Sequence, residues 1–153
     1  MNWSEFEQAS PAQAEYGRDR FGTGVAYLAT VKADGSPRVH PVTPIIGNAR
    51  LFLFMEPTSP KGDDLRRDGR YALHCSVENS SGGQGEFLIE GTANYTDDPS
   101  ARSIAIESAS YQPTERYILF ELGVRRAFST TYDDEGQAIR TVWSSKPGNT
   151  SLR

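Results

Sequence analysis

The sequence predicts a mainly β protein, an antiparallel barrel with a few short flanking helices. Short runs of strand-forming residues recur along the 153 residues, tight-turn dipeptides such as Asp34-Gly35 separate them, and no repeat of solenoid period is present. The length is that of one ordinary domain, and no Ser/Gly/Pro-rich stretch is long enough to be a linker. We therefore expect one domain over residues 1–153, with a helical segment at 1–22 and a polar tail at 144–153.

Composition and charge exclude several classes of protein. The formal net charge is −4, whereas a general nucleic-acid binder needs a basic surface to displace counterions from phosphates. No apolar run approaches the roughly 20 residues of a membrane span, and the polar first twenty residues contain no apolar signal-peptide core. Cys75 is the one cysteine, so no intrachain disulfide can form, which fits a reducing compartment. We expect a cytoplasmic protein that binds neither nucleic acid nor membranes.

Two cap patterns predict helix at the N-terminus. Ser4 with Glu7 three residues later forms a capping-box pattern. Ser10 followed by Pro11 is typical of a second helix start, because proline at the first helical position loses no helix hydrogen bond. We expect this second helix to run to about residue 20.

Three strands are expected next. The apolar run at residues 25–31 leads into the Asp-Gly turn named above and so predicts the first strand of a hairpin. The return strand, residues 38–46, contains Pro41 and Pro44. Because proline cannot donate to a strand ladder, we expect an open edge or a bulge there. The third strand is expected at residues 51–55.

The rest of the chain alternates between strands and two short helices. Ser59 as N-cap and Pro60 as first residue predict a helix that ends near residue 68. Asp98 and Pro99 open another helix that reaches about residue 109. The remaining strands are expected at residues 71–77, 86–95, 117–131 and 137–143, and a flexible loop at 79–85.

The start of the helix at Ser59 is a candidate anion site. A helix N-terminus offers unpaired N–H groups and a partial positive charge, to which Ser59 adds a hydroxyl and Lys61 a full charge. Arg38 can approach the same pocket if its strand is adjacent, and Pro41 leaves part of the backbone free to meet a ligand. The alternative is that Ser59 only caps the helix, Arg38 and Lys61 face solvent, and Pro41 marks an ordinary edge.

Other chemistries have little support in the sequence. His40 and His74 are the only histidines, and with one cysteine they offer no zinc-ligand spacing. His74 and Cys75 are neighbours on a predicted strand and so point to opposite faces, which disfavours a Cys–His catalytic pair. His40 remains open between a ligand neighbour and a plain strand residue.

Three segments together resemble the pyridoxamine 5′-phosphate oxidase-like family of flavin-binding split barrels. They are residues 28–31, residues 34–42 and the Ser59-Pro60-Lys61 element. The spacing from the hairpin to the Ser-x-Lys element carries the resemblance, and the ordered pattern spans roughly residues 25–77.

The resemblance implies a six-stranded antiparallel split barrel of Greek-key topology and FMN-binding type. It also implies a homodimer with FMN bound between the subunits. Carried over by position, the implied cofactor-binding residues are Arg38, Val39, His40, Pro41, Val42, Thr43, Phe54, Met55, Ser59, Pro60, Lys61 and Glu86.

The sequence departs from the authentic oxidases at two places. Glu86 stands where they carry a glutamine near the flavin ring, and a carboxylate facing an electron-rich reduced flavin is unfavourable. The arginine and histidine pattern that binds their substrate phosphate is not reproduced, although Arg125, Arg126 and Trp143 lie in that region. Pyridoxamine phosphate is therefore a poor substrate prediction.

The function implied is that of an FMN-dependent oxidoreductase acting on an unidentified small molecule. One alternative is a reductase of the same fold that uses the deazaflavin F420. The oligoglutamyl tail of F420 favours an extended basic groove, for which Arg66 and Arg67 are the candidate residues. Another alternative is a non-catalytic flavin-binding or stress-related protein. A haem-binding variant has no support from the context of either histidine.

Overall fold

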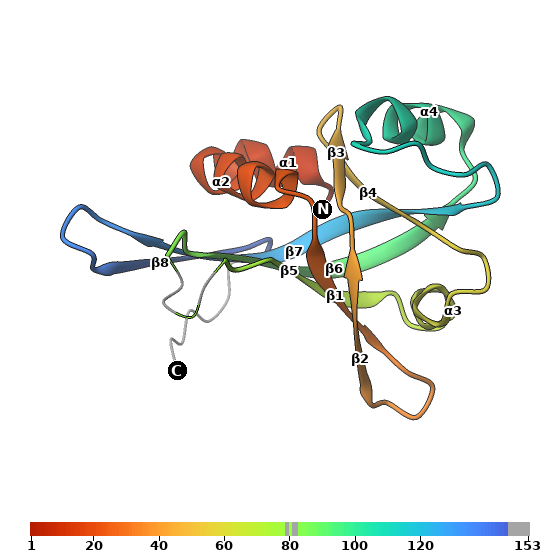
Figure 1. Ribbon diagram of the computed structural model, residues 1–153, viewed down its shortest axis with the longest axis horizontal. Helices are drawn as coiled ribbons and strands as arrows, with labels where there is room; N and C mark the ends of the chain where they lie inside the picture. Colours follow the sequence, from red (N-terminus) through yellow and green to blue (C-terminus); the bar gives the residue numbers. More distant parts are fainter. Residues whose placement is uncertain (79, 81–82, 147–153) are drawn as a thin grey trace.

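The computed structural model describes residues 1–78, 80 and 83–146, which form an antiparallel sheet with helices packed around it (Figure 1). The helices are α1 (Trp3–Ala9), α2 (Pro11–Gly22), α3 (Pro60–Arg67) and α4 (Pro99–Ser108). The strands are β1 (Ala26–Val31), β2 (Pro37–Val42), β3 (Ile45–Gly47), β4 (Arg50–Met55), β5 (Arg70–Cys75), β6 (Glu86–Thr96), β7 (Ile118–Tyr132) and β8 (Ala138–Ser144).

Strand order shows why the sheet curls into a barrel. The order is β2-β1-β5-β6-β7-β4-β3, with β8 paired to β7, so β2 and β3 lie at opposite ends of the path. Only Thr43 and Pro44 separate these two strands in the chain. The sheet must therefore bend round until its two ends meet, and the predicted mainly β, antiparallel split barrel is confirmed.

The sheet has eight strands where the family resemblance implied six. One reason is the expected return strand at residues 38–46, which is broken into β2 and β3. The break falls at Thr43-Pro44, where proline removes a ladder donor. The expected irregularity at the prolines is thus present, and it divides one strand into two.

The first helix begins earlier than the sequence pattern predicted. The capping box uses Asn2 and Glu5: the Glu5 amide donates to Asn2 Oδ1 at 2.9 Å, and the Asn2 amide donates to Glu5 Oε2 at 2.6 Å. The prediction that Ser4 and Glu7 form the box is wrong. Ser10 precedes α2 with Pro11 in the first turn, as expected, but its side chain makes no cap hydrogen bond.

Two apolar clusters form the core. The larger one fills the barrel and includes Trp3 and Phe6 of α1. The smaller one lies between α4 and the outer side of β4, where Phe52 and Phe54 are buried. Leu51, Leu53 and Met55 of the same strand belong to the larger cluster. Because alternate side chains of β4 enter different clusters, both of its faces are buried.

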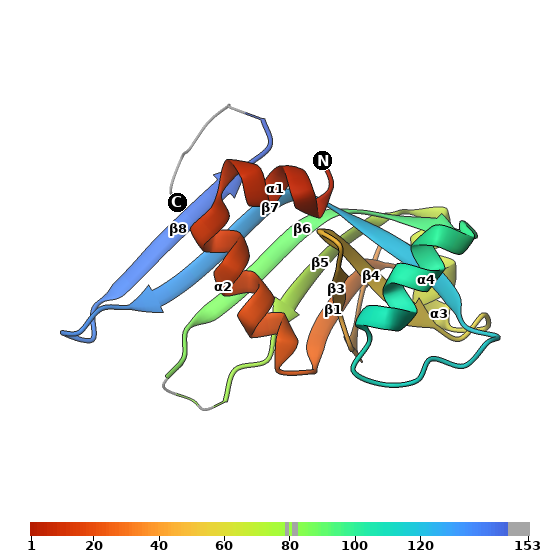
Figure 2. The same cartoon turned by 90° about the horizontal axis from the view of Figure 1, so that it is seen from above.

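The N-terminal helices cover one face of strands β5 to β8, and no helix among the described residues covers the opposite face of those strands. Figure 2 shows α1 and α2 lying across the strands β5 to β8. The register places one residue from each of six strands in a row across the opposite face. That row consists of Pro41, Tyr27, His74, Leu88, Phe128 and Val142.

Two expected irregular regions reach beyond the described residues. The loop expected at residues 79–85 includes Asn79, Ser81 and Gly82, and the tail expected from residue 144 includes residues 147–153. Those positions lie outside the described residues. Within the described ranges, none of the helices has the length and apolarity of a membrane span.

Candidate functional site

Register places Arg38 and His40 on the side of β2 that faces α3. Arg38 lies opposite Thr30 and His40 lies opposite Leu28, and both of these β1 residues are buried. Directly opposed residues of an antiparallel pair share a face. Thr30 Oγ1 donates to Asp64 of α3 at 2.8 Å, which fixes this face as the one toward the helix.

Ser59 and Lys61 contact each other at the start of α3. Ser59 is in the N-cap position and buried, but its side chain makes no cap hydrogen bond; it accepts a hydrogen bond from Lys61 Nζ at 3.0 Å. Among the described residues, no carboxylate forms an ion pair with Lys61. Burial lowers the pKa of Lys61, because the charged form loses hydration that no counterion replaces.

Backbone donors contribute less to this site than the sequence predicted. The amides of Gly62 and Asp63 already donate to the Ser59 carbonyl at 2.9 and 3.2 Å, and Pro60 has no N–H. In the described part of the chain, this leaves the Lys61 amide as the free donor of the first turn. An anion at this helix start would therefore be bound mainly by side chains.

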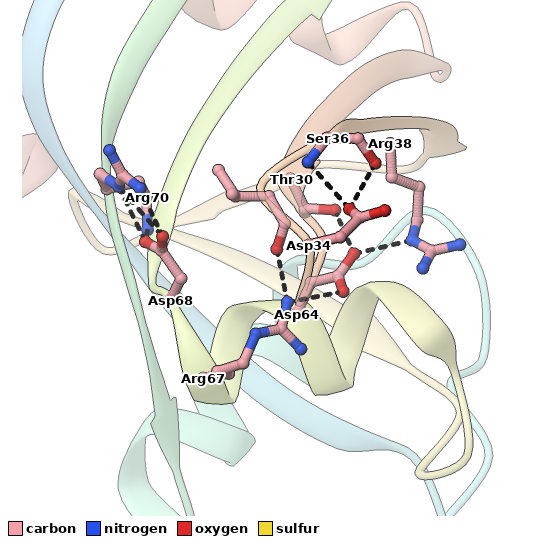
Figure 3. Close-up of polar contacts among 9 residues, drawn as sticks. Thr30, Asp34, Ser36, Arg38, Asp64, Arg67, Asp68 and Arg70 are labelled. Carbon is pink, nitrogen blue, oxygen red and sulfur yellow. Dashed lines mark hydrogen bonds and ion pairs between the residues drawn. The ribbon is translucent and has the colours of Figure 1, made fainter.

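Arg38 is held by a buried carboxylate. Its Nε donates to Asp64 Oδ2 at 2.7 Å, the same oxygen that accepts from Thr30 (Figure 3). Arg67 Nη2 donates to the other oxygen at 3.0 Å. Burial acts to raise the pKa of Asp64, but the hydrogen bonds from Arg38, Thr30 and Arg67 outweigh it and lower the pKa below its usual value.

The positive charges of Lys61 and Arg38 affect the protonation of His40. The pKa of His40 is lowered from 6.5, first by burial and then by the charges of Lys61 and Arg38. This effect places both cations within electrostatic range of one imidazole. Arg38 contacts α3 through Asp64, and Lys61 contacts Ser59 at the start of the same helix, so all three predicted side chains lie at α3.

The remaining predicted residues of β2 and the following turn divide between other surroundings. Val39 and Pro41 point to the outer face, where Val39 is 65% exposed. Val42 is buried in the barrel core. Thr43 lines a separate hollow of about 170 Å³ beside the end of α2. A single chain thus presents these predicted flavin neighbours on two faces of β2.

The predicted contacts from β4 also separate. Met55 lies under α3, where a Cβ added at Gly62 would come within 3.3 Å of its sulfur. Phe54 faces α4, with the Arg102 guanidinium 5.2 Å from its ring centroid. Pro60 is exposed and lines a hollow of about 410 Å³ beside Arg38. Met55 and Pro60 therefore border the candidate site, and Phe54 does not.

Glu86 lies at the far end of its strand from α3. It begins β6 and pairs with Thr130, whereas α3 is followed by Gly69, whose carbonyl accepts from Ala93 near the other end of β6. One chain does not bring Glu86 to the anion site. Its place beside a flavin, carried over from the family, stays a prediction that requires a second copy of the chain.

Sequence reasoning missed Asp64 and Thr30. Both are buried polar residues that connect α3 with the β1–β2 hairpin. A weak signal was present: Thr30 occupies the same alternating position as Ala26 and Leu28, which puts its hydroxyl on the inner face of the strand. Such a hydroxyl needs a polar partner.

Comparisons with known proteins place the chain in context. The sequence profile of the family described as pyridoxamine 5′-phosphate oxidase matches residues 20–139. Among curated proteins, none matches the chain. The profile match extends well past the segments from which the resemblance was drawn.

Solved structures share the fold at low sequence identity. A haem-binding protein from Mycobacterium smegmatis superposes with a TM-score of 0.68 and 19% identity over 86% of this chain, which spans 57% of that protein. A conserved hypothetical protein from Mycobacterium tuberculosis superposes with a TM-score of 0.66 and 20% identity, over 86% of this chain and 92% of that protein. A candidate pyridoxamine 5′-phosphate oxidase from Listeria innocua superposes with a TM-score of 0.58 and 15% identity, over 74% of this chain and 94% of that protein. At these identities the likeness establishes the fold.

Proposed function

The chain belongs to the pyridoxamine 5′-phosphate oxidase family, and we propose that it binds FMN and works as a flavin-dependent oxidoreductase on a small molecule. Ser59, Lys61 and Arg38 would hold the phosphate, and His40 would lie beside it. The isoalloxazine ring, when bound, supplies hydride or electron transfer, so that this chain's residues need only bind, orient and shield it.

The observation that supports this proposal most strongly is the environment of Lys61. A partly buried ammonium group whose hydrogen bond goes to a neutral hydroxyl has lost hydration without gaining a counterion. A dianionic phosphate between β2 and α3 would supply that counterion. The donors present therefore fit a terminal phosphate: an ammonium, a hydroxyl and the free end of a guanidinium.

A homodimer is part of the proposal. In the row across the outer face of the strands, Tyr27 is followed by His74 and then by Leu88, Phe128 and Val142, and Tyr27 is 46% exposed. Extended apolar rows of this kind are typical of protein interfaces. Association through this face would bring the outer side of β2 against a second copy, which explains why the predicted flavin neighbours are divided between two faces.

F420 is less well accommodated than FMN. Its oligoglutamyl tail needs free cations, and the two arginines at the end of α3 already have partners. Arg67 donates to Asp64 and to the Val31 carbonyl, and Arg66 lies over the Tyr95 ring with its guanidinium 5.2 Å from the centroid. These contacts favour the shorter anionic group.

The absorption spectrum of the purified protein tests the cofactor directly. The proposal predicts the spectrum of oxidised FMN, or its appearance on titration of flavin-free protein with FMN. Mass spectrometry of the compound released on denaturation separates FMN from F420. A spectrum dominated by haem, as the Mycobacterium smegmatis neighbour's name suggests for that protein, would overturn the assignment.

Turnover separates an enzyme from a carrier. The oxidoreductase predicts reduction of the bound flavin by NADH, NADPH or another hydride donor, followed by reoxidation by a substrate. A flavin-loaded protein that accepts electrons from none of these donors would favour the non-catalytic carrier.

A further inference from the structure

Asp64 is a buried charge that the proposed FMN binding does not itself use. The residue is 3% exposed, and its carboxylate accepts hydrogen bonds from three side chains on three elements: Thr30 of β1, Arg38 of β2 and Arg67 of α3. A buried ion pair gives little net stability compared with apolar residues of similar volume, because desolvation offsets its attraction. The geometry that this network imposes is therefore of more interest than its stability.

The geometry concerns the orientation of Arg38. Asp64 Oδ2 takes the Nε–H of Arg38, the donor on the inner edge of the guanidinium. Figure 3 shows the two terminal nitrogens pointing away from the carboxylate. In the described part of the chain these nitrogens form no other hydrogen bond. Four N–H groups in a fixed plane are thus left for a ligand, and that arrangement matches two phosphate oxygens.

Arg38 needs such support because of where it lies. Its strand, β2, is at the end of the sheet, and the neighbouring residues Val39 and His40 are exposed. A free arginine on an exposed edge samples many rotamers, and binding must then order it at a cost. Asp64 is attached to the buried part of α3 and to β1, so it is a rigid anchor.

We infer that Asp64 is a positioning residue that orients Arg38 for the phosphate of the bound flavin. This inference rests on the proposed FMN binding. Asp64 touches neither the phosphate nor the ring in this arrangement; it acts through the Nε of Arg38, with Thr30 fixing the shared oxygen. Arg67, on the other oxygen, neutralises the carboxylate.

The test compares FMN with riboflavin, which has the same ring and no phosphate. Flavin-free protein is titrated with each, and the ratio of the riboflavin Kd to the FMN Kd reports the phosphate alone. The Asp64→Ala variant is expected to lower this ratio about three- to tenfold, the effect of having to order one long side chain on binding. Riboflavin affinity should stay unchanged, whereas a purely structural role would weaken both flavins.

Double substitution identifies the route of the effect. In an Arg38→Ala background, Asp64→Ala should cause no further change in the ratio. Arg67→Gln is the matched control, since it removes a hydrogen bond from the same carboxylate while leaving Arg38 attached, and the ratio should stay within about twofold of wild type. Should Asp64→Ala fail to fold, Asp64→Asn keeps the shape, weakens the charge-assisted contact, and should shift the ratio in the same direction.

The outcomes separate the two proposals. A wild-type ratio near one overturns the phosphate site, and this inference with it. A large wild-type ratio that Asp64→Ala leaves unchanged overturns the positioning role alone. An increased ratio in Asp64→Ala also overturns it, because the carboxylate would then act only as a negative charge that opposes the phosphate.

Discussion

Replacing Lys61 by alanine is expected to weaken FMN binding without destabilising the flavin-free protein. The ammonium group donates to Ser59 Oγ, and its pKa is lowered because burial is not offset by a counterion. A lysine whose pKa is lower in the folded state than in the unfolded state binds its proton less tightly when folded. Below its folded pKa, its charge therefore opposes folding, and its removal takes away an unfavourable contribution.

The magnitude follows from the contact that would be lost. A hydrogen bond to a charged group contributes about 1.5–3 kcal/mol, so the FMN Kd should rise about 10- to 150-fold in Lys61→Ala. Riboflavin affinity should hardly change. The free energy of unfolding of the flavin-free variant should be equal to or higher than that of wild type. A decrease of more than about 0.5 kcal/mol would contradict this expectation.

Flavin fluorescence titration and chemical denaturation measure the two effects. Lys146→Ala is the control, because it removes the same formal charge from a separate hollow beside Gly123 and Val124, away from Ser59. Its FMN Kd should change less than about threefold. Equal weakening in the two variants would show that only overall charge matters, and an unchanged Kd in Lys61→Ala would refute the phosphate contact.

Three further results are expected. In an NMR titration the pKa of His40 should lie below 6.5, because burial and the charges of Lys61 and Arg38 disfavour the imidazolium, and this pKa should rise when FMN binds. The contribution of His40 to the stability of the flavin-free protein should fall as the pH decreases through 6.5. A His40 pKa that FMN leaves unchanged would count against the site. Tyr27→Asp should convert a dimer to a monomer in light-scattering measurements and reduce FMN retention; a monomeric wild type contradicts the interface. Phe87→Ala should cost about 3–5 kcal/mol in denaturation, since the fully buried ring packs edge-on against Phe21 at 5.2 Å, and a loss under about 1 kcal/mol would show that the core is misassigned.

Local chemistry in the sequence predicted some features of the fold well. Pro41 and Pro44 predicted an open edge or a bulge in the return strand, because proline has no N–H for a ladder hydrogen bond, and that strand proved to be divided into β2 and β3. The N-cap of the first helix was harder to predict from the sequence, since Asn2 with Glu5 and Ser4 with Glu7 both fit a cap pattern. The chain begins the helix at the earlier pair, and the Met1 carbonyl accepts from the Val124 amide at 2.8 Å. That contact joins residues far apart in the sequence.

In the candidate site, too, contacts between residues close in the sequence were predictable and contacts made by tertiary packing were not. Ser59 and Lys61 are two residues apart, so their contact follows from spacing at a helix start. Asp64 meets Thr30 only because α3 packs against β1, a contact between residues 34 positions apart. Sequence spacing carries no information on that packing, and the supporting carboxylate was therefore missed.

The prolines of β2 have a consequence for how copies of this protein can associate. β2 ends the strand order, and a bare strand at the border of a sheet can recruit a strand from another molecule and so begin aggregation. Pro37 and Pro41 occupy the same alternating set of positions; Pro41 lies inside the stretch paired with β1, and Pro37 lies at its end. Because neither has an N–H to offer, the border of the sheet is a poor template for strand addition, and molecules that meet there are directed away from fibril-like growth.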